Sequence, residues 1–253
     1  MVPVDPQENT APAAARAEIV CWTAGLGAIT AESLAIRLQV SIPSARARLL
    51  VAQRERLLVR QRPLVDRPAL YTVTRRGLRA VSARGLDPAR VSAGGAAHLI
   101  ECARVAAMLE RGYPDHRVAG ERELRRDERE QGRALASAEL GADSHGRLLP
   151  HRPDLVLWPH DSHVGLPVAI EVELTVKAPD RLLRICRGWA RARCIAGVVY
   201  LAAPAVERAL TRAVEGARAH ERIAIVPLDA LAEATTATAP ETVPRERSVP
   251  SSS

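Results

Sequence analysis

The spacing of hydrophobic positions changes several times between residues 16 and 82, which indicates a series of short elements. Thr30 is placed to cap a helix, and Gln39–Ile42 has the character of a tight turn. Pro43 fits the first turn of the helix that follows, with Ser41 or Ile42 near its cap. The pattern predicts helices over 16–26, 31–38 and 43–56, strands over 57–62 and 69–73, and a helix over 74–82.

Longer elements are predicted after residue 95. An amphipathic helix over 96–110 precedes a polar stretch, 117–146, where we expect a short strand near Val118 and otherwise an irregular, mobile loop. The remaining pattern predicts strands over 152–158, 167–175, 196–202 and 223–227, with helices over 179–194 and 205–220. This order predicts a mixed α/β (α+β) layer fold.

Polar, Pro-, Ala- and Ser-rich segments suggest the domain boundaries. Residues 1–15 are expected to form a disordered leader and residues 234–253 a disordered tail. Glycine and proline between 82 and 95 suggest a linker. We therefore expect two domains, 16–92 and 96–233.

Composition favours an intracellular protein. No window approaches 18 consecutive apolar residues, so we expect no membrane-spanning helix. The N-terminus lacks the basic start and apolar centre of a signal peptide, which favours the cytoplasm. The four cysteines show no zinc-finger spacing, so reduced and mostly buried thiols are expected.

Positive charge is concentrated in the first part of the chain. Residues 1–95 contain 14 Arg and 7 acidic residues, whereas the remaining 22 basic and 22 acidic residues balance. A general Arg bias would act on both parts, so it does not explain the asymmetry. A basic excess confined to one domain is typical of contact with nucleic-acid phosphates.

The stretch 29–80 resembles the winged helix-turn-helix family, through Leu34-Ala35-x-x-Leu38-x-Val40-Ser41, Ala45-x-x-x-Leu49 and Tyr71-x-Val73-Thr74-x-x-Gly77. The resemblance implies that the third helix enters the major groove of double-stranded DNA and the wing follows the backbone. Ala45, Leu49, Leu50 and Leu57 are expected to face the core. An alternative is that this domain contacts only protein. The expected DNA-binding residues are Ser44, Arg46, Arg48, Arg54, Arg60, Arg62, Arg67, Arg75 and Arg76.

Acidic residues interrupt two predicted strands of the second region. Asp154 opens one strand, and Glu171 and Glu173 alternate along the next, which places both glutamates on one face. Neighbouring carboxylates repel each other unless a cation is bound, and Mg²⁺ prefers oxygen ligands. Lys177 would lie on the same face as Glu171 and Glu173 if the alternation continued. It is the only lysine in a chain with 35 Arg. A retained Lys suggests that a compact charge matters at this position.

Pro153-Asp154 and Glu171-x-Glu173 resemble the PD-(D/E)xK nuclease superfamily. The resemblance implies a three-layer, mixed-sheet, restriction-endonuclease-like domain. Asp154 and Glu171 would bind Mg²⁺, with Glu173 and Lys177 completing the catalytic set of a DNA endonuclease. Glu173 stands where Lys is usual, and this departure favours a degenerate site.

The alternatives are an inactive or recognition-only domain, whose acids lie at a solvated edge or pair with Arg181 or Arg184, and an unrelated α/β domain. Glu101 is expected on a solvated helix face, whereas Glu121 is a better site candidate because it should follow a strand. Three histidines, His98, His151 and His160, show no ligand spacing.

Residues 16–230 together resemble the replication-relaxation family. The resemblance rests on the winged-helix motifs, on Arg152-Pro153-Asp154 and on Glu171-Val-Glu173-Leu-Thr175-Val-Lys177. It implies a DNA-binding role in plasmid or mobile-element replication or transfer. The alternative is a winged-helix transcription regulator whose second domain mediates homodimerisation or senses a signal.

Overall fold

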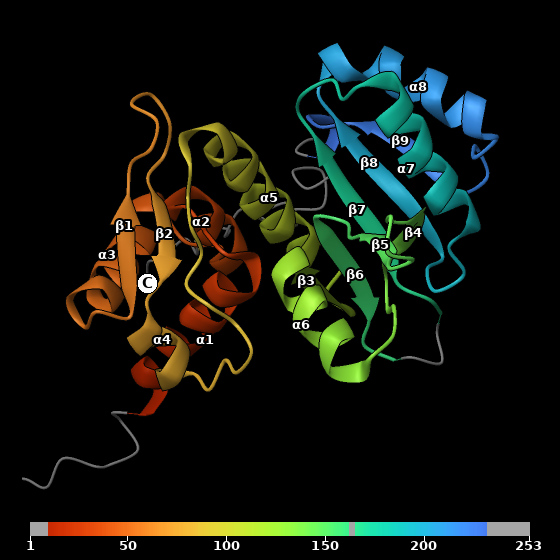
Figure 1. Cartoon of the computed structure of the whole chain (residues 1–253). Coiled ribbons are helices and arrows are strands. Elements are labelled where there is room, and N and C mark those ends of the chain that lie inside the picture. The colour runs from red at the N-terminus through yellow and green to blue at the C-terminus, as the bar shows by residue number, and fades with distance from the viewer. Residues whose placement is uncertain (1–9, 162–164, 232–253) are drawn as a thin grey trace, which may run out of the picture.

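The computed structural model describes residues 10–161 and 165–231, which form a mixed α/β structure of two adjoining parts (Figure 1). The expected tail, 234–253, lies outside the described residues, as do residues 1–9 of the expected leader. The first part consists of α1 (Thr10–Leu26), α2 (Ala31–Leu38), α3 (Ile42–Arg54), β1 (Leu58–Gln61), β2 (Leu70–Val73) and α4 (Arg75–Ala80).

Polar caps set the helix boundaries of the first part. The Thr30 side chain accepts a hydrogen bond from the Ser33 N–H, and the Ser33 hydroxyl accepts one from the Thr30 N–H in return. Gln39 adopts a left-handed conformation with φ of 54° after α2, and Ser41 then caps α3. Gly77 lies so close to the Leu57 carbonyl that an added Cβ would approach its oxygen to 2.3 Å. This contact requires glycine and fixes α4 against the β1–β2 hairpin.

The second part is built on a five-stranded sheet of order β3-β6-β7-β8-β9. Strand β6 is antiparallel to both β3 and β7, whereas β7, β8 and β9 run parallel to one another. Parallel strands need a crossover, which α7 provides before β8 and α8 before β9. The elements are α5 (Ala93–Gly112), β3 (His116–Gly120), α6 (Glu121–Gln131), β4 (Ala138–Ala142), β5 (Leu148–His151), β6 (Leu155–Pro159), β7 (Val168–Glu173), α7 (Pro179–Arg191), β8 (Gly197–Ala202), α8 (Pro204–Ala217) and β9 (Ile223–Pro227).

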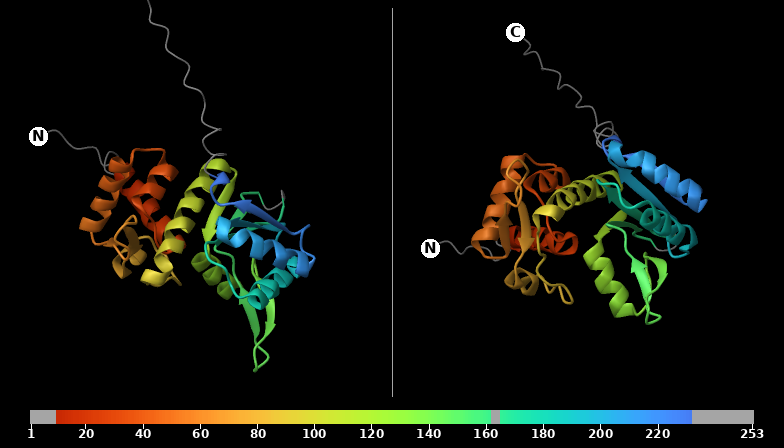
Figure 2. Two further views of the ribbon diagram at one scale, coloured as in Figure 1. Left: turned by 90° about the horizontal axis from the view of Figure 1, so that it is seen from above. Right: turned by 45° about the horizontal axis from the view of Figure 1, so that its top comes forward.

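Alternate residues of the central strand β7 face different helices. Ile170 and Val172 belong to a cluster that includes α5, whereas Ala169 packs in a second cluster with α7 and α8. The fully buried Trp189 and Tyr200 lie in the second cluster. The sheet is therefore a middle layer between α5 and the α7–α8 pair (Figure 2).

One hydrophobic cluster joins the two parts, because it contains residues of α1–α3 and also of α5 and the sheet. Polar contacts reinforce this junction. The Trp22 indole N–H donates to Glu110 Oε1 at 2.8 Å, and Arg37 Nε lies 2.5 Å from Glu110 Oε2. The helix α5 therefore packs on α2 as well as on the sheet.

Several boundaries differ from those expected. Helix α1 begins at Thr10 instead of residue 16, and Ser92 caps α5 so that Gly94 and Gly95 are helical instead of linker. The expectation of an irregular loop after β3 is wrong, because α6 and the β4–β5 hairpin form there. Leu50 was expected to face the core, but it is 44% exposed. No helix among the described residues has the length and apolar character needed to cross a membrane.

Candidate functional site

A pocket of about 480 Å³ lies where β6 begins and β7 ends. Its wall contains all four residues expected at the catalytic site, Asp154, Glu171, Glu173 and Lys177. The pocket also includes residues from α5, α6 and the segment around β5, among them His98, Glu121, Arg125, His151 and Arg152.

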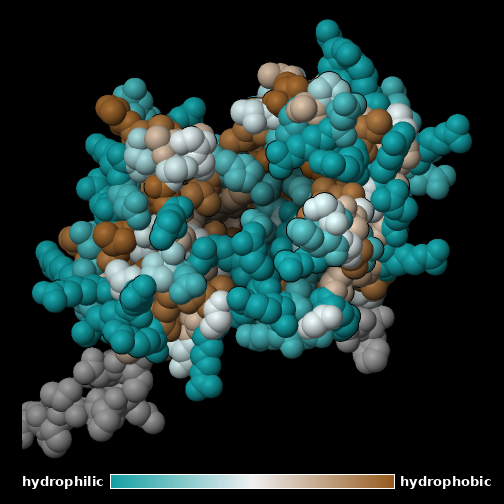
Figure 3. Space-filling view, in the orientation of Figure 1, coloured by the Kyte–Doolittle hydropathy of each residue, from teal (hydrophilic) through white to brown (hydrophobic). Residues whose placement is uncertain are grey.

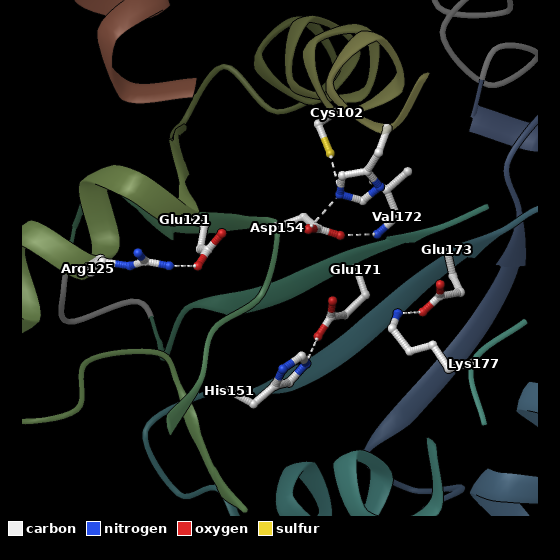
Figure 4. Close-up of polar contacts among 10 residues, drawn as sticks. Cys102, Glu121, Arg125, His151, Asp154, Glu171, Val172, Glu173 and Lys177 are labelled. Carbon is white, nitrogen blue, oxygen red and sulfur yellow. Dashed lines mark hydrogen bonds and ion pairs between the residues drawn. The ribbon is translucent and has the colours of Figure 1, made fainter. Parts of the chain in front are cut away.

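Strand register explains why the acids meet. Leu155 pairs with Ile170, so continuing the antiparallel register by one residue places Asp154 opposite Glu171. Glu173 follows two residues later on the same face of β7. Asp154 Oδ2 accepts the Val172 N–H at 2.8 Å, which fixes the carboxylate beside the strand (Figure 4).

Glu171 is almost completely buried and has two side-chain donors. Its Oε1 accepts hydrogen bonds from His151 Nε2 at 2.7 Å and from Trp189 Nε1 at 3.1 Å. Burial raises the pKa of Glu171, and the nearby His151 opposes this shift. The indole thus anchors the pocket carboxylate to α7.

Glu173 is paired with Lys177 inside the pocket (Figure 4). The glutamate side chain is 5% exposed and the lysine 28% exposed. Burial lowers the pKa of Lys177. The side-chain partners of Glu171 and Glu173 are therefore His151 and Lys177, and not Arg181 or Arg184 as one sequence-based alternative held.

His98 links Asp154 to α5. Its Nε2 lies 2.9 Å from Asp154 Oδ1 and 3.4 Å from Cys102 Sγ. The hydrogen bond to Asp154 raises the pKa of His98, and burial raises that of the Cys102 thiol well above its usual value. Sequence reasoning missed both His98 and His151. The four-residue spacing of His98 and Cys102 on one helix was the available signal for the first.

Glu121 is the first residue of α6 and follows β3 directly, as expected. It lines the pocket and pairs with Arg125. Glu101, which is also on α5, forms an ion pair with Arg104 at 2.7 Å. Of these two further acids, only Glu121 is part of the pocket wall.

The expected DNA-binding arginines form a second candidate surface. All eight are exposed, whereas Ser44 is partly buried at the start of α3, where its N–H bonds to the Ser41 side chain. A groove of about 450 Å³ between α3 and the β1–β2 hairpin is lined by Arg46, Arg60 and Arg62. Hydrophilic side chains project from this end of the molecule (Figure 3).

Comparison with protein-family models gives no match, and neither the curated proteins nor the solved structures include one that matches this chain.

Proposed function

We propose that this protein binds double-stranded DNA, with α3 and the β1–β2 hairpin acting as the recognition helix and wing of a winged helix-turn-helix. The observation that carries the proposal is the exposure of all eight arginines on α3, the hairpin and α4. The order of helices and strands in the first part also agrees with the plan of that family.

The two faces of α3 suit this role. Ala45 and Leu49 are fully buried and hold the helix on the core, while Arg46 and Arg48 face solvent. Arg46 also forms an exposed ion pair with Glu32 at 3.2 Å, which phosphate can replace at little cost. In this proposal α3 enters the major groove, and the arginines of the hairpin contact the phosphate backbone.

Replacing two arginines of α3 tests the proposal. Arg46→Ala together with Arg48→Ala should weaken duplex binding by about tenfold or more, at roughly 1 kcal/mol per contact. The matched control is Arg208→Ala with Arg212→Ala, which removes two exposed arginines from α8 in the second part. Equal affinities of the two double variants, measured by fluorescence anisotropy, would exclude α3 as the DNA-contacting helix.

A second proposed function is Mg²⁺-dependent hydrolysis of a DNA phosphodiester in the carboxylate pocket. The supporting observation is that Asp154, Glu171, Glu173 and Lys177 share one pocket wall. The oxygen donors of Asp154 and Glu171 fit a hard divalent cation. When bound there, Mg²⁺ would stabilise the charge that develops on phosphate.

The side chains of the chain have distinct roles in this proposal. His98 and Val172 orient Asp154, and Trp189 and His151 orient Glu171. Lys177 neutralises charge beside the scissile phosphate, and Glu173 holds its ammonium group in position.

Cleavage of supercoiled and single-stranded DNA with Mg²⁺ or Mn²⁺ tests this second function. Asp154→Ala should abolish cleavage, and Lys177→Arg should greatly reduce it, because guanidinium is bulkier and planar. Arg208→Ala should cleave as the parent does. Cleavage that survives Asp154→Ala, or a folded parent without activity, would leave the pocket as a recognition or assembly site.

We further propose that the protein is cytoplasmic and acts in plasmid or mobile-element replication or transfer, as the replication-relaxation resemblance implies. Binding at a plasmid origin would support this role. A homodimer that binds a short palindromic operator would instead support a transcription regulator.

A further inference from the structure

Three metal-ligating atoms of different chemistry meet beneath α5. His98 Nε2, Cys102 Sγ and a carboxylate oxygen of Asp154 all lie within 4.8 Å of one another. The two α5 residues are one helical turn apart, so their side chains leave the same helix face. In Figure 4, the Cys102 thiol points from α5 toward the His98 ring, which in turn contacts Asp154 just before β6.

The separations suit a bound ion. Nε2 lies 2.9 Å from Oδ1 of Asp154 and 3.4 Å from Sγ of Cys102. Ligands at about 2.0–2.3 Å from a tetrahedral zinc ion lie roughly 3–4 Å from one another. Two of the three separations are thus close to those around zinc, and Sγ and the carboxylate oxygen, within 4.8 Å of each other, would rotate toward the bound ion.

Backbone contacts hold the carboxylate in place. Asp154 Oδ2 accepts the Val172 N–H at 2.8 Å, and the Asp154 carbonyl accepts the Glu121 N–H at 3.0 Å. Cys102 is 9% exposed within a hydrophobic cluster. Outer contacts of this kind orient metal ligands and increase metal affinity.

We propose that His98, Cys102 and Asp154 form a binding site for a transition-metal ion of the zinc class. Thiolate and imidazole are ligands for Zn²⁺ or Co²⁺, whereas Mg²⁺ prefers oxygen. The site thus differs from the proposed magnesium site: Asp154 is a ligand in both, and His98, which there only orients Asp154, binds the metal here. On binding, the metal–sulfur bond forms and the Cys102 thiol proton passes to solvent.

The site has room for a fourth ligand. A second pocket, of about 240 Å³, is lined by His98, Cys102, Asp154 and also Glu121. The fourth ligand of the metal site is therefore water or the Glu121 carboxylate. Three protein ligands beside a pocket are typical of zinc sites that bind an exchangeable ligand, whereas structural zinc sites are closed.

Titration of the full chain with Co²⁺ tests the proposal, independently of DNA binding or cleavage. Cobalt bound by a thiolate gives a sulfur-to-metal charge-transfer absorption band. The band should saturate at one ion per chain, disappear when Zn²⁺ displaces cobalt, and persist in excess Mg²⁺. The control Cys21→Ser removes an exposed thiol of α1 and should leave the band unchanged.

Two ligand variants complete the experiment. Cys102→Ser should abolish the band, and His98→Gln, at a ring 39% exposed, should weaken cobalt binding by at least about tenfold. Circular dichroism establishes whether each variant is folded. If Cys102→Ser does not fold, the cobalt affinity of His98→Gln tests the proposed site. The proposal is overturned by a parent without the band, by a band that persists in folded Cys102→Ser, or by unchanged cobalt affinity in His98→Gln.

Discussion

Three acids of the carboxylate pocket each have different partners. Asp154 contacts His98 and the Val172 N–H, Glu171 contacts His151 and Trp189, and Glu173 contacts Lys177. Buried carboxylates need such partners, because the loss of hydration is otherwise not compensated. The separate partners hold three carboxyl groups in one pocket wall, and the carboxyl groups need not bond to each other.

Burial of individual thiols predicts how fast each cysteine reacts with an alkylating agent. Burial raises the pKa of Cys186 to about 11, so little thiolate is present at a pH of about 8 and its reaction with alkylating agents is slow. Cys102 is protected for the same reason, whereas Cys21 is exposed. Mass spectrometry of the native chain should show labelling of Cys21 first, and of Cys102 and Cys186 only after unfolding. Equally fast labelling of Cys102 and Cys21 would contradict the packing of α5.

Alternation along β7 was enough to predict that Glu171 and Glu173 share one face, because strand parity is local, whereas Lys177 lies beyond the end of β7 and reaches the pocket through its pair with Glu173. The histidines could not be predicted in the same way. His98 lies 56 residues before Asp154, and His151 lies 20 residues before Glu171. Only the packing of α5 and β5 around the sheet brings these rings to the acids.

At the scale of elements, α3 has a narrow buried face. Ala45, Leu49 and Ala52 are buried, while Leu50 and Val51 are more than two-fifths exposed. A narrow buried stripe leaves most of the helix surface available to a partner. It also makes the helix position depend on few side chains.

Two adjacent leucines of α3, one buried and one exposed, test which face of the helix packs on the core. Leu49→Ala should lower the free energy of unfolding by about 2–5 kcal/mol, because it leaves a cavity at a fully buried position. Leu50→Ala should cost only about 0.5 kcal/mol, as is usual for surface positions. Urea denaturation of the full chain measures both values. A loss for Leu50→Ala as large as that for Leu49→Ala would mean that α3 packs with another face inward.

Helix α6 shows where sequence patterns are insufficient. Its sequence is almost entirely charged, so no apolar stripe indicates a helix. The structure positions it through one buried leucine, Leu124, and through Glu128, which accepts the Leu135 N–H at 3.0 Å and pairs with Arg152 at 2.7 Å. By contrast, α2 and α3 were predictable, because their caps and turn lie within a few residues of each other.

In the whole molecule, the excess positive charge is confined to one part, whereas the hydrophobic packing extends over both. The excess positive charge lies in residues 1–95, whereas a single hydrophobic cluster extends across both parts. The helix α5 contributes His98 to the carboxylate pocket and also packs on α2. The proposed DNA surface and the pocket therefore belong to one continuously packed molecule.

The salt dependence of binding by the full chain is the sharpest test of whether the basic first part binds duplex DNA. Each phosphate that an arginine neutralises releases counterions, so log K falls linearly with log salt. With several phosphate contacts, affinity should fall by at least about tenfold between roughly 50 and 200 mM KCl. An affinity independent of salt, or no binding to duplex at the lower concentration, would show that the arginines of the first part do not bind DNA phosphates.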